Sequence, residues 1–279
     1  MILPDEIVDL EEIAPHPNIL VFAVSGTGKS VFAGTDDDIL FLNCEAEGTL
    51  STRRFSAGNN RKEWKIKCWN DFEKALEWLK DSLDECVRTG EKFPFKWVVV
   101  DTITTLQNRV LMRHLMDQAV SKNSNRDPNV PDKPEYLKSQ LMIQRAVKEL
   151  NDLPVCILYL AHVMQKEDSE GDTFMFPAIQ GKGYEVAQAV LAMMTSFGYM
   201  FSQVRKRDGK TVVDTKTKKP VRDRIIQWES YGEKLGKDRT GVLGERTRNI
   251  TLREIRERME QKDKEELEKS SAAKNLKGK

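Results

Sequence analysis

The stretch Ala23-Val24-Ser25-Gly26-Thr27-Gly28-Lys29-Ser30 decides how the rest of this sequence is interpreted. The apolar run Ile19–Phe22 precedes it and predicts a buried strand, and a helix is expected from Lys29 onward. The stretch fits the pattern G-x-x-x-x-G-K-[ST], with alanine in the first position. Backbone N–H groups in such a loop surround phosphate groups at the start of a helix. The residues expected to bind a nucleotide are Ser25, Gly26, Thr27, Gly28, Lys29, Ser30 and Val31.

Three side chains near this pattern carry specific expectations. Lys29 supplies a positive charge for the β- and γ-phosphates, and the Ser30 hydroxyl is a ligand for Mg²⁺. Asp101 ends the valine-rich run Trp97–Val100, where a second Mg²⁺-binding group is expected. The alternatives are an ordinary small-residue turn for the loop and an ordinary strand-end acid for Asp101.

The chain around the loop alternates between strand-like and helix-like segments, which predicts an α/β fold with a mainly parallel sheet flanked by helices. Further strands are expected at Ile39–Asn43, Trp64–Trp69 (an edge strand), Val155–Leu160, Phe197–Val204 and Arg224–Trp228, the last two in an antiparallel C-terminal part. Helices are expected at Asp71–Arg88, with Val87 on its apolar face, at Thr104–Val120, at Glu135–Leu150 and after Gln180.

The composition limits the classes of protein that this chain can represent. Its 279 residues carry 45 Lys and Arg against 44 Asp and Glu, so the formal net charge is +1. This balance excludes a strongly basic nucleic-acid coat but not a local basic path. No apolar run approaches the roughly 18 residues of a spanning helix, so no membrane partner is expected. We expect a cytoplasmic protein with four reduced cysteines, without a signal peptide.

The position of an acid at a strand end separates the nucleotide-binding classes. Thr102 follows Asp101, so the Asp-Glu pair of AAA+ and helicase-type motors is absent. Glu45 instead follows the strand Ile39–Asn43. If that strand lies between those of the phosphate loop and Asp101, Glu45 is directed at the γ-phosphate, where it orients and deprotonates water. Glu47 is the substitute base, and a solvent-facing acid is the alternative for Glu45.

The segments AVSGTGKS, FLNCE and VVVDTITTL, in this order, resemble the RecA family. More closely, the chain resembles the phage RecA-like recombinases linked to single-strand annealing, over roughly residues 15–245. The resemblance implies a RecA-type P-loop NTPase core with ATP and Mg²⁺ as cofactors. It also implies self-association into a ring or filament that acts on single-stranded DNA in recombination, annealing or repair. If the source is a phage, the compartment is the host cytoplasm.

The resemblance also assigns roles to four later residues. His162, at the end of CILYLAH, corresponds to a polar sensor of the γ-phosphate, although a structural histidine is the alternative. Lys237 and Arg239 correspond to a finger that reaches the γ-phosphate of a neighbouring subunit, unless they are a solvated charge pair. Lys182, in a glycine-rich turn, is a candidate contact to DNA or phosphate.

In RecA-like proteins, two loops hold DNA, and they correspond here to about residues 121–134 and 163–178. The second loop has an acidic tip (Glu167, Asp168, Glu170 and Asp172), so we interpret it as a hairpin that turns at Asp168–Gly171. Phe174 and Phe176 on its arm either stack on bases or, as we prefer, pack in the core. The densest basic segment is the hairpin Arg207–Val221 with the residues just before it, which either follows a phosphate backbone or is a solvated hairpin. The candidate DNA contacts are Lys122, Arg126, Lys133, Lys182, Arg205, Lys206 and Arg207.

We therefore expect an N-terminal lead (residues 1–14), an ATPase core (15–250) and a charged helical, partly disordered tail (251–279). The arginines of the tail are expected to pair with acids of the same helix, and a single-strand DNA-binding protein is a candidate partner for it. Three alternatives to a DNA-stimulated ATPase remain open. These are a nucleoside or nucleotide kinase, a non-hydrolysing ATP-gated DNA-binding module, and a ring helicase or packaging-motor core.

Overall fold

The computed structural model describes residues 16–46, 49, 51–52, 60–167, 171, 173–182 and 185–277, so the expected N-terminal lead lies outside it. The helices are α1 (Lys29–Ala33), α2 (Trp69–Thr89), α3 (Ile103–Thr105), α4 (Met112–Lys122), α5 (Lys133–Asn151), α6 (Glu185–Ala192) and α7 (Leu252–Lys277), and a π-helical segment η3 (Leu106–Leu111) joins α3 to α4. The strands are β1 (Asn18–Ala23), β2 (Ile39–Asn43), β3 (Arg61–Lys65), β4 (Trp97–Asp101), β5 (Cys156–Glu167), β6 (Thr173–Pro177), β7 (Ser196–Val204), β8 (Lys206–Arg207), β9 (Lys210–Thr211), β10 (Arg222–Gln227), β11 (Lys237–Asp238) and β12 (Arg246–Arg248).

Within the described residues, ten strands form one sheet whose main path is β12-β10-β7-β1-β5-β4-β2-β3. The strands from β7 to β3 are parallel to their neighbours. The strands β10, β11 and β12 add antiparallel pairs at the C-terminal side. The expected mixed α/β fold with a mostly parallel sheet is therefore confirmed.

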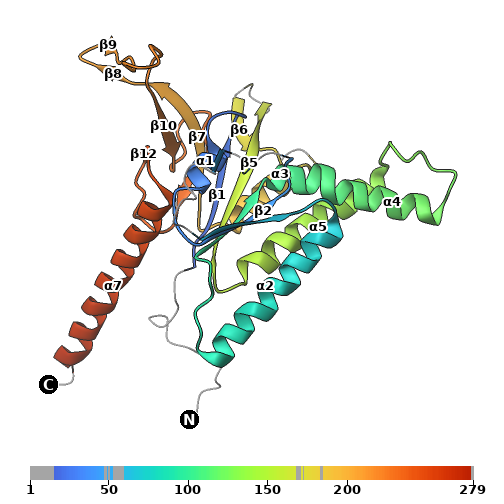
Figure 1. Ribbon diagram of the computed structural model, residues 1–279, viewed down its shortest axis with the longest axis horizontal. Helices are drawn as coiled ribbons and strands as arrows, with labels where there is room; N and C mark the ends of the chain where they lie inside the picture. The colour runs from blue at the N-terminus through green and yellow to red at the C-terminus, as the bar shows by residue number, and fades with distance from the viewer. Residues whose placement is uncertain are drawn as a thin grey trace.

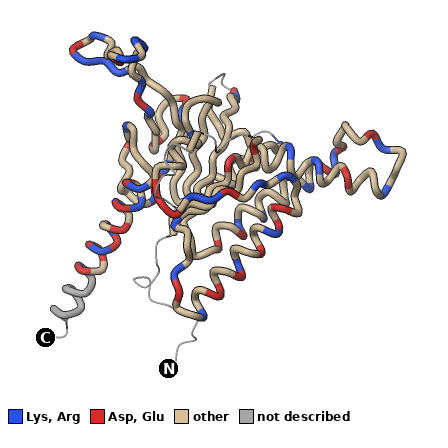
Figure 2. Tube along the Cα trace, in the orientation of Figure 1, with Lys and Arg blue, Asp and Glu red and all other residues tan. Residues whose placement is uncertain are grey.

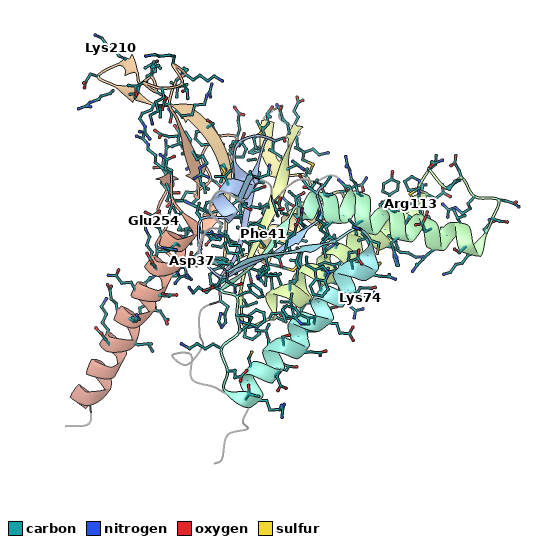
Figure 3. The ribbon with its side chains drawn as sticks, in the orientation of Figure 1. Asp37, Phe41, Lys74, Arg113, Lys210 and Glu254 are labelled. Carbon is teal, nitrogen blue, oxygen red and sulfur yellow. The ribbon has the colours of Figure 1, made fainter. Side chains whose placement is uncertain are left out.

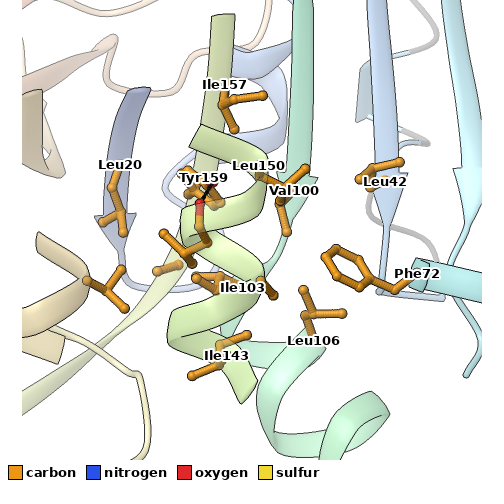
Figure 4. Packing of buried hydrophobic residues seen from close by; sticks show 14 of the residues in the cluster. Leu20, Leu42, Phe72, Val100, Ile103, Leu106, Ile143, Leu150, Ile157 and Tyr159 are labelled. Atoms are coloured by element: carbon orange, nitrogen blue, oxygen red, sulfur yellow. Dashed lines mark hydrogen bonds between the residues drawn. The ribbon is translucent and has the colours of Figure 1, made fainter. Parts of the chain in front are cut away.

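Successive residues of each central strand point to opposite faces of the sheet, and both faces are buried. Leu20, Leu42 and Val100 point to the face that α2, α5 and α6 cover, and Figure 4 shows this packing around Tyr159. Their neighbours in sequence point to the other face, which α1 and the first turns of α7 cover. The result is a three-layer α/β/α arrangement (Figure 1), in which the loops at the carboxyl ends of the parallel strands share one edge of the sheet.

The sheet order corrects one expectation about the neighbour of the phosphate-loop strand. The strand β2 does not lie between β1 and β4, because β5 occupies that position and β2 lies on the far side of β4. Asn43 of β2 is in register with Asp101 of β4, and Ala23 of β1 is in register with His162 of β5. Glu45 therefore has to reach across β4, and its surroundings are described below.

Most elements follow the expected ones, with two local differences. The edge strand is β3, which ends at Lys65 instead of Trp69, since Trp69 begins α2. Val87 lies on the exposed side of α2, with 79% of its surface accessible, so it does not belong to the apolar face. The hairpin of β5 and β6 is confirmed by the antiparallel pairing of Val163–Glu167 with Thr173–Pro177.

The tail helix α7 is anchored to the core by its first turns. Ile255 is fully buried, and Arg256 donates to the carboxylate of Asp36 at 2.7 Å. Arg253 pairs with Asp37 as well, so the expectation of a self-paired charged helix is wrong for this arginine, whereas Arg256 also pairs with Glu260 of the same helix at 2.8 Å. Beyond the buried first turns, α7 projects away from the sheet (Figure 1). No helix within the described ranges is long and apolar enough to cross a membrane.

Candidate nucleotide site

The phosphate loop connects the buried end of β1 to the start of α1 and is shaped by two glycines. Gly26 has φ 82° and Gly28 has φ 100°, which are left-handed conformations that glycine adopts without strain. Ser25 and Gly26 are exposed, and Thr27 folds its hydroxyl back to the carbonyl of Val24 at 2.8 Å. The loop therefore has the strand–loop–helix context and the backbone turns that a phosphate cradle needs.

Lys29 lies inside this loop and is almost completely buried. Its ammonium donates to the carbonyl oxygens of Ala23 at 3.0 Å and Val24 at 3.4 Å. Burial lowers its pKa, while the carboxylates of Asp101 and Glu45 oppose that effect. The structure thus places one cation at the position where the β- and γ-phosphates of a nucleotide would lie.

The Ser30 hydroxyl and the Asp101 carboxylate meet beside the loop. The hydroxyl donates to Oδ2 of Asp101 at 2.8 Å, and it is the one hydrogen-bond donor to that carboxylate within the described part of the chain. Asp101 is only 1% exposed, and burial, together with the charge of Glu45, raises its pKa to about 6. A buried carboxylate with so few donors costs free energy, and a cation would offset that cost.

These two groups fit Mg²⁺ rather than a metal held by protein ligands alone. No group of three or more His, Cys, Asp or Glu side chains suited to a metal occurs among the described residues. Mg²⁺ typically binds through one or two protein oxygens, with water and substrate phosphates completing its octahedron. Ser30 and Asp101 are the residues that would hold it.

Glu45 lies at the centre of a hydrogen-bonded cluster at the same edge of the sheet. Its Oε1 atom is 3.0 Å from Nε2 of His162 and accepts hydrogen bonds from Thr102 at 3.1 Å and Thr105 at 3.2 Å. The hydrogen bond from His162 is the largest cause that lowers the pKa of Glu45, to about 2. Glu45 is therefore an anchored carboxylate and not a freely moving surface acid.

The strand register explains how residues far apart in sequence meet here. His162 lies on β5 beside Ala23 of β1, while Asp101 ends β4 beside Asn43 of β2. The amide of Glu45 donates to Oδ1 of Asn43, which turns the chain back over the end of β4. Because all four strands are parallel, their carboxyl ends bring Glu45, His162, Asp101 and the phosphate loop to one edge.

Several residues of this edge were not predicted. Thr102 and Thr105 hold Glu45, and the Thr104 hydroxyl accepts from the backbone amide of His162 at 3.0 Å. The threonine-rich run after Asp101 was the available sequence signal. Arg224 of β10 donates to the carbonyl of Gly28 at 3.4 Å, and no local pattern indicates this contact, since the two residues are 196 positions apart.

Lys237 and Arg239 do not join this edge within one chain. Lys237 is in register with Phe197 near the beginning of β7, which is the end of the sheet opposite the phosphate loop. Its ammonium donates to the carbonyl of Leu191 at 3.2 Å and lies 5.4 Å from the ring centre of Phe197. Arg239 lines a separate cavity that includes His16 and Lys262. A role for either residue in a neighbouring subunit stays a prediction.

The candidate DNA contacts differ in whether their side chains already form ion pairs within the chain. Arg126 pairs with Glu135 at 2.8 Å and with Asp132 at 2.9 Å, and Arg205 forms an ion pair with the buried Asp223. These two guanidinium groups therefore serve the local structure. Lys122, Lys133, Lys182, Lys206 and Arg207 are exposed.

The hairpin of β8 and β9 forms a basic projection from the core. Figure 2 shows mostly Lys and Arg along this segment, and Lys210 lies at its tip in Figure 3. Phe176 is buried and Phe174 packs against the same core, in agreement with the packing interpretation. Glu47, Asp168, Glu170 and Asp172 lie outside the described residues.

The sheet, the phosphate loop and the Ser30–Asp101 pair define the class of P-loop NTPases. A family model described as an AAA domain matches residues 16–240, and the chain belongs to this AAA-domain family of P-loop NTPases. The matched region contains the loop, Glu45, Asp101 and His162. Membership implies nucleotide binding, usually with Mg²⁺. A comparison with curated proteins finds no match.

Proposed function

We propose that this chain is a RecA-like ATPase that binds Mg²⁺ and ATP and acts on single-stranded DNA in recombination, annealing or repair. The observation that carries the ATPase part is the convergence of Glu45, Asp101 and Lys29 at one edge of the sheet. The order of the motifs, with the acid after β2 instead of directly after Asp101, supports the RecA-like assignment. A phage origin and self-association into a ring or filament are parts of the same proposal.

The residues of the site divide the reaction between them. The loop amides and Lys29 bind the phosphates, and Ser30 and Asp101 hold Mg²⁺, which neutralises charge that develops on the phosphates. Glu45 orients the attacking water and accepts its proton. A carboxylate with a pKa of about 2 is a weak base, but a triphosphate beside it raises that pKa through like-charge repulsion. His162 fixes the Glu45 carboxylate through the 3.0 Å contact.

The test is phosphate release from ATP, measured with and without oligothymidylate, for the natural chain and Glu45→Gln. We expect hydrolysis that the strand stimulates, and a loss of turnover on the order of 10²–10⁴-fold in the variant. ATP binding should persist in Glu45→Gln and disappear in Lys29→Ala. An unchanged turnover in Glu45→Gln would instead favour a non-hydrolysing module, and phosphorylation of an added nucleoside would identify a kinase.

Assembly is tested separately by sedimentation with ATP, with single-stranded DNA and with both. The proposal predicts oligomers that depend on nucleotide and strand. A chain that stays monomeric and ignores DNA under all conditions would refute both the DNA-directed role and a role for Lys237 or Arg239 in a neighbouring subunit.

A further inference from the structure

A cavity of about 540 Å³ opens next to Glu45 on the side away from the phosphate loop strand. Its walls come from three elements: the segment after β2, the end of β3 with the turn that follows it, and one face of η3 and α4. Four cations line it, namely Lys65, Lys67, Arg109 and Arg113, together with two carboxylates, Glu45 and Asp117. None of the four was a candidate from the sequence, because they come from segments that are distant in the chain.

The charges of this cavity are unevenly compensated. Arg113 pairs with Asp117 at 2.9 Å, and Glu45 is held by His162 at 3.0 Å. Lys65, Lys67 and Arg109 have no ion pair with any carboxylate in the part of the chain that the structure describes, and all three are exposed. The lining therefore favours an anionic ligand.

The cations also form two rows. Lys65 and Lys67 are two positions apart along an extended segment, which separates them by about 6–7 Å. Arg109 and Arg113 are four positions apart on a helical segment, which separates them by about 6 Å along its axis. Successive phosphates of an extended nucleic-acid strand repeat at a similar spacing. Two rows with this spacing suit a chain of phosphates better than a single phosphate.

We infer that this cavity binds the phosphodiester backbone of single-stranded DNA, with successive phosphates between the Lys65–Lys67 row and the Arg109–Arg113 row. The inference rests on the proposed DNA-directed function and adds a site to it that differs from the predicted loops. A strand bound there contacts the same segment, Asn43–Ala46, that carries Glu45. This arrangement gives DNA a direct physical route to the catalytic carboxylate.

The first test compares two double variants of equal charge change. Lys67→Ala with Arg109→Ala removes one cation from each row, and Lys74→Ala with Lys92→Ala removes two exposed cations outside the cavity (Lys74 is labelled on α2 in Figure 3). Oligothymidylate binding is measured by fluorescence anisotropy over a range of salt concentrations, after thermal melts establish that both variants fold.

The slope of log K against log salt is negative. For the cavity variant, we expect its magnitude to fall by about 1.4, since each lost phosphate contact contributes roughly 0.7. If the curves meet at 1 M salt, this corresponds to roughly a 25-fold loss of affinity at 0.1 M. The control variant should match the natural chain. An unchanged slope in the cavity variant, with normal binding by the natural chain, overturns the inference and leaves the proposed function intact.

A second test uses Cys68, a free and exposed thiol that lines the cavity. Its alkylation by iodoacetamide is followed by peptide mass spectrometry, with Cys86 of α2 as an internal reference. Oligothymidylate should slow alkylation of Cys68 and not of Cys86, while thymidine monophosphate and inorganic phosphate should have no effect.

Two results of the thiol experiment contradict the inference in different ways. If thymidine monophosphate protects Cys68 and is itself phosphorylated by the chain, the cavity is the acceptor site of a kinase. Absence of protection by a strand that is bound would place the DNA elsewhere. If the natural chain does not bind oligothymidylate in any nucleotide state, both the inference and the DNA-directed function fail.

Discussion

Two aspartates at opposite edges of the sheet are equally buried but differ in their hydrogen-bond donors and in the direction of their pKa shifts. Asp36 is 0% exposed and Asp101 is 1% exposed. Asp36 accepts hydrogen bonds from Arg256 at 2.7 Å and from the indole N–H of Trp97 at 3.0 Å. Burial alone would raise its pKa, but these donors outweigh burial and lower it. Asp101 accepts a side-chain hydrogen bond only from the Ser30 hydroxyl among the described residues, and its pKa rises to about 6.

We interpret Asp36 as a structural carboxylate and, on the proposed function, Asp101 as a functional one. At the Asp36 edge, the chain supplies its own cations and thereby attaches α7 to the sheet. At the Asp101 edge, no arginine or lysine forms an ion pair with the carboxylate among the described residues, although Lys29 is near enough to influence its pKa. A buried carboxylate without a paired cation is unfavourable for folding, and this cost marks a place for a ligand's cation.

The largest expected effect is on stability at the Asp36 edge. Asp36→Ala should lower the free energy of unfolding by about 3–5 kcal/mol, because Arg256, whose side chain is 15% exposed, then keeps only the half-exposed Glu260 among its partners in the described residues. Urea unfolding at neutral pH measures this loss. Adding Arg256→Met should recover much of it, since an apolar pair replaces the ion pair. A loss below about 1 kcal/mol in the single variant would contradict the structural role.

A smaller effect on stability, of opposite sign, is expected for Asp101→Asn when unfolding is measured without Mg²⁺. Asp101→Asn should stabilise the chain at pH 8 by roughly 1–3 kcal/mol, because it removes a charge whose pKa is raised by burial. The natural chain loses this stability as the pH rises from 3.8 through about 6, so the gain should vanish below pH 3.8.

Asp36→Asn is the matched control for that experiment. Its pKa is lowered, so the charged form stabilises the fold above pH 3.8 and the variant should be less stable than the natural chain there. The difference should shrink on acidification. Equal signs for the two variants at pH 8 would remove the distinction between the two edges.

The smallest of these effects concerns His162 as a positioning residue. His162→Ala removes the donor that contributes most to the low pKa of Glu45, so that pKa should rise from about 2 towards 4.5. The acid limb of the pH–rate profile should then move to higher pH. Turnover at neutral pH should fall about tenfold, because the loss of a fixed carboxylate orientation outweighs the gain in basicity. His162→Gln, which keeps an N–H donor, should restore part of both. A profile that does not move would reduce His162 to a packing role.

The sequence predicted the parts of this molecule that local patterns determine. The strand Ile39–Asn43, the helix after Trp69 and the phosphate loop each follow from hydrophobic periodicity or a short motif. Glu45 and Asp101 could be proposed from their positions at the ends of apolar strands, and His162 from the resemblance to the RecA family. That the three meet depends on the strand order, which periodicity does not determine.

The contacts that the sequence did not reveal are long-range. Asp36 and Arg256 are 220 positions apart, and Glu45 and His162 are 117 apart. Arg126 and Glu135 are only nine residues apart, but this pair was not predicted either. Several acids lie near Arg126 in the sequence, and the sequence does not indicate which of them pairs with it. Ion pairs within the fold engage Arg126 and Arg205, whose contact with DNA stays a prediction, and the cations beside Glu45 are brought together only by the folded arrangement.

We infer that Asp101 has no paired cation among the described residues because it serves a nucleotide's Mg²⁺. The most direct test is ATP turnover over a Mg²⁺ titration for the natural chain, Asp101→Asn and Asp36→Asn, each below its melting temperature. Asp101→Asn should lose on the order of 10²–10³-fold in turnover despite its higher stability, since a metal contributes several kcal/mol of charge stabilisation. Asp36→Asn should keep the Mg²⁺ dependence of the natural chain. Turnover of Asp101→Asn within about threefold of the natural chain would contradict the claim.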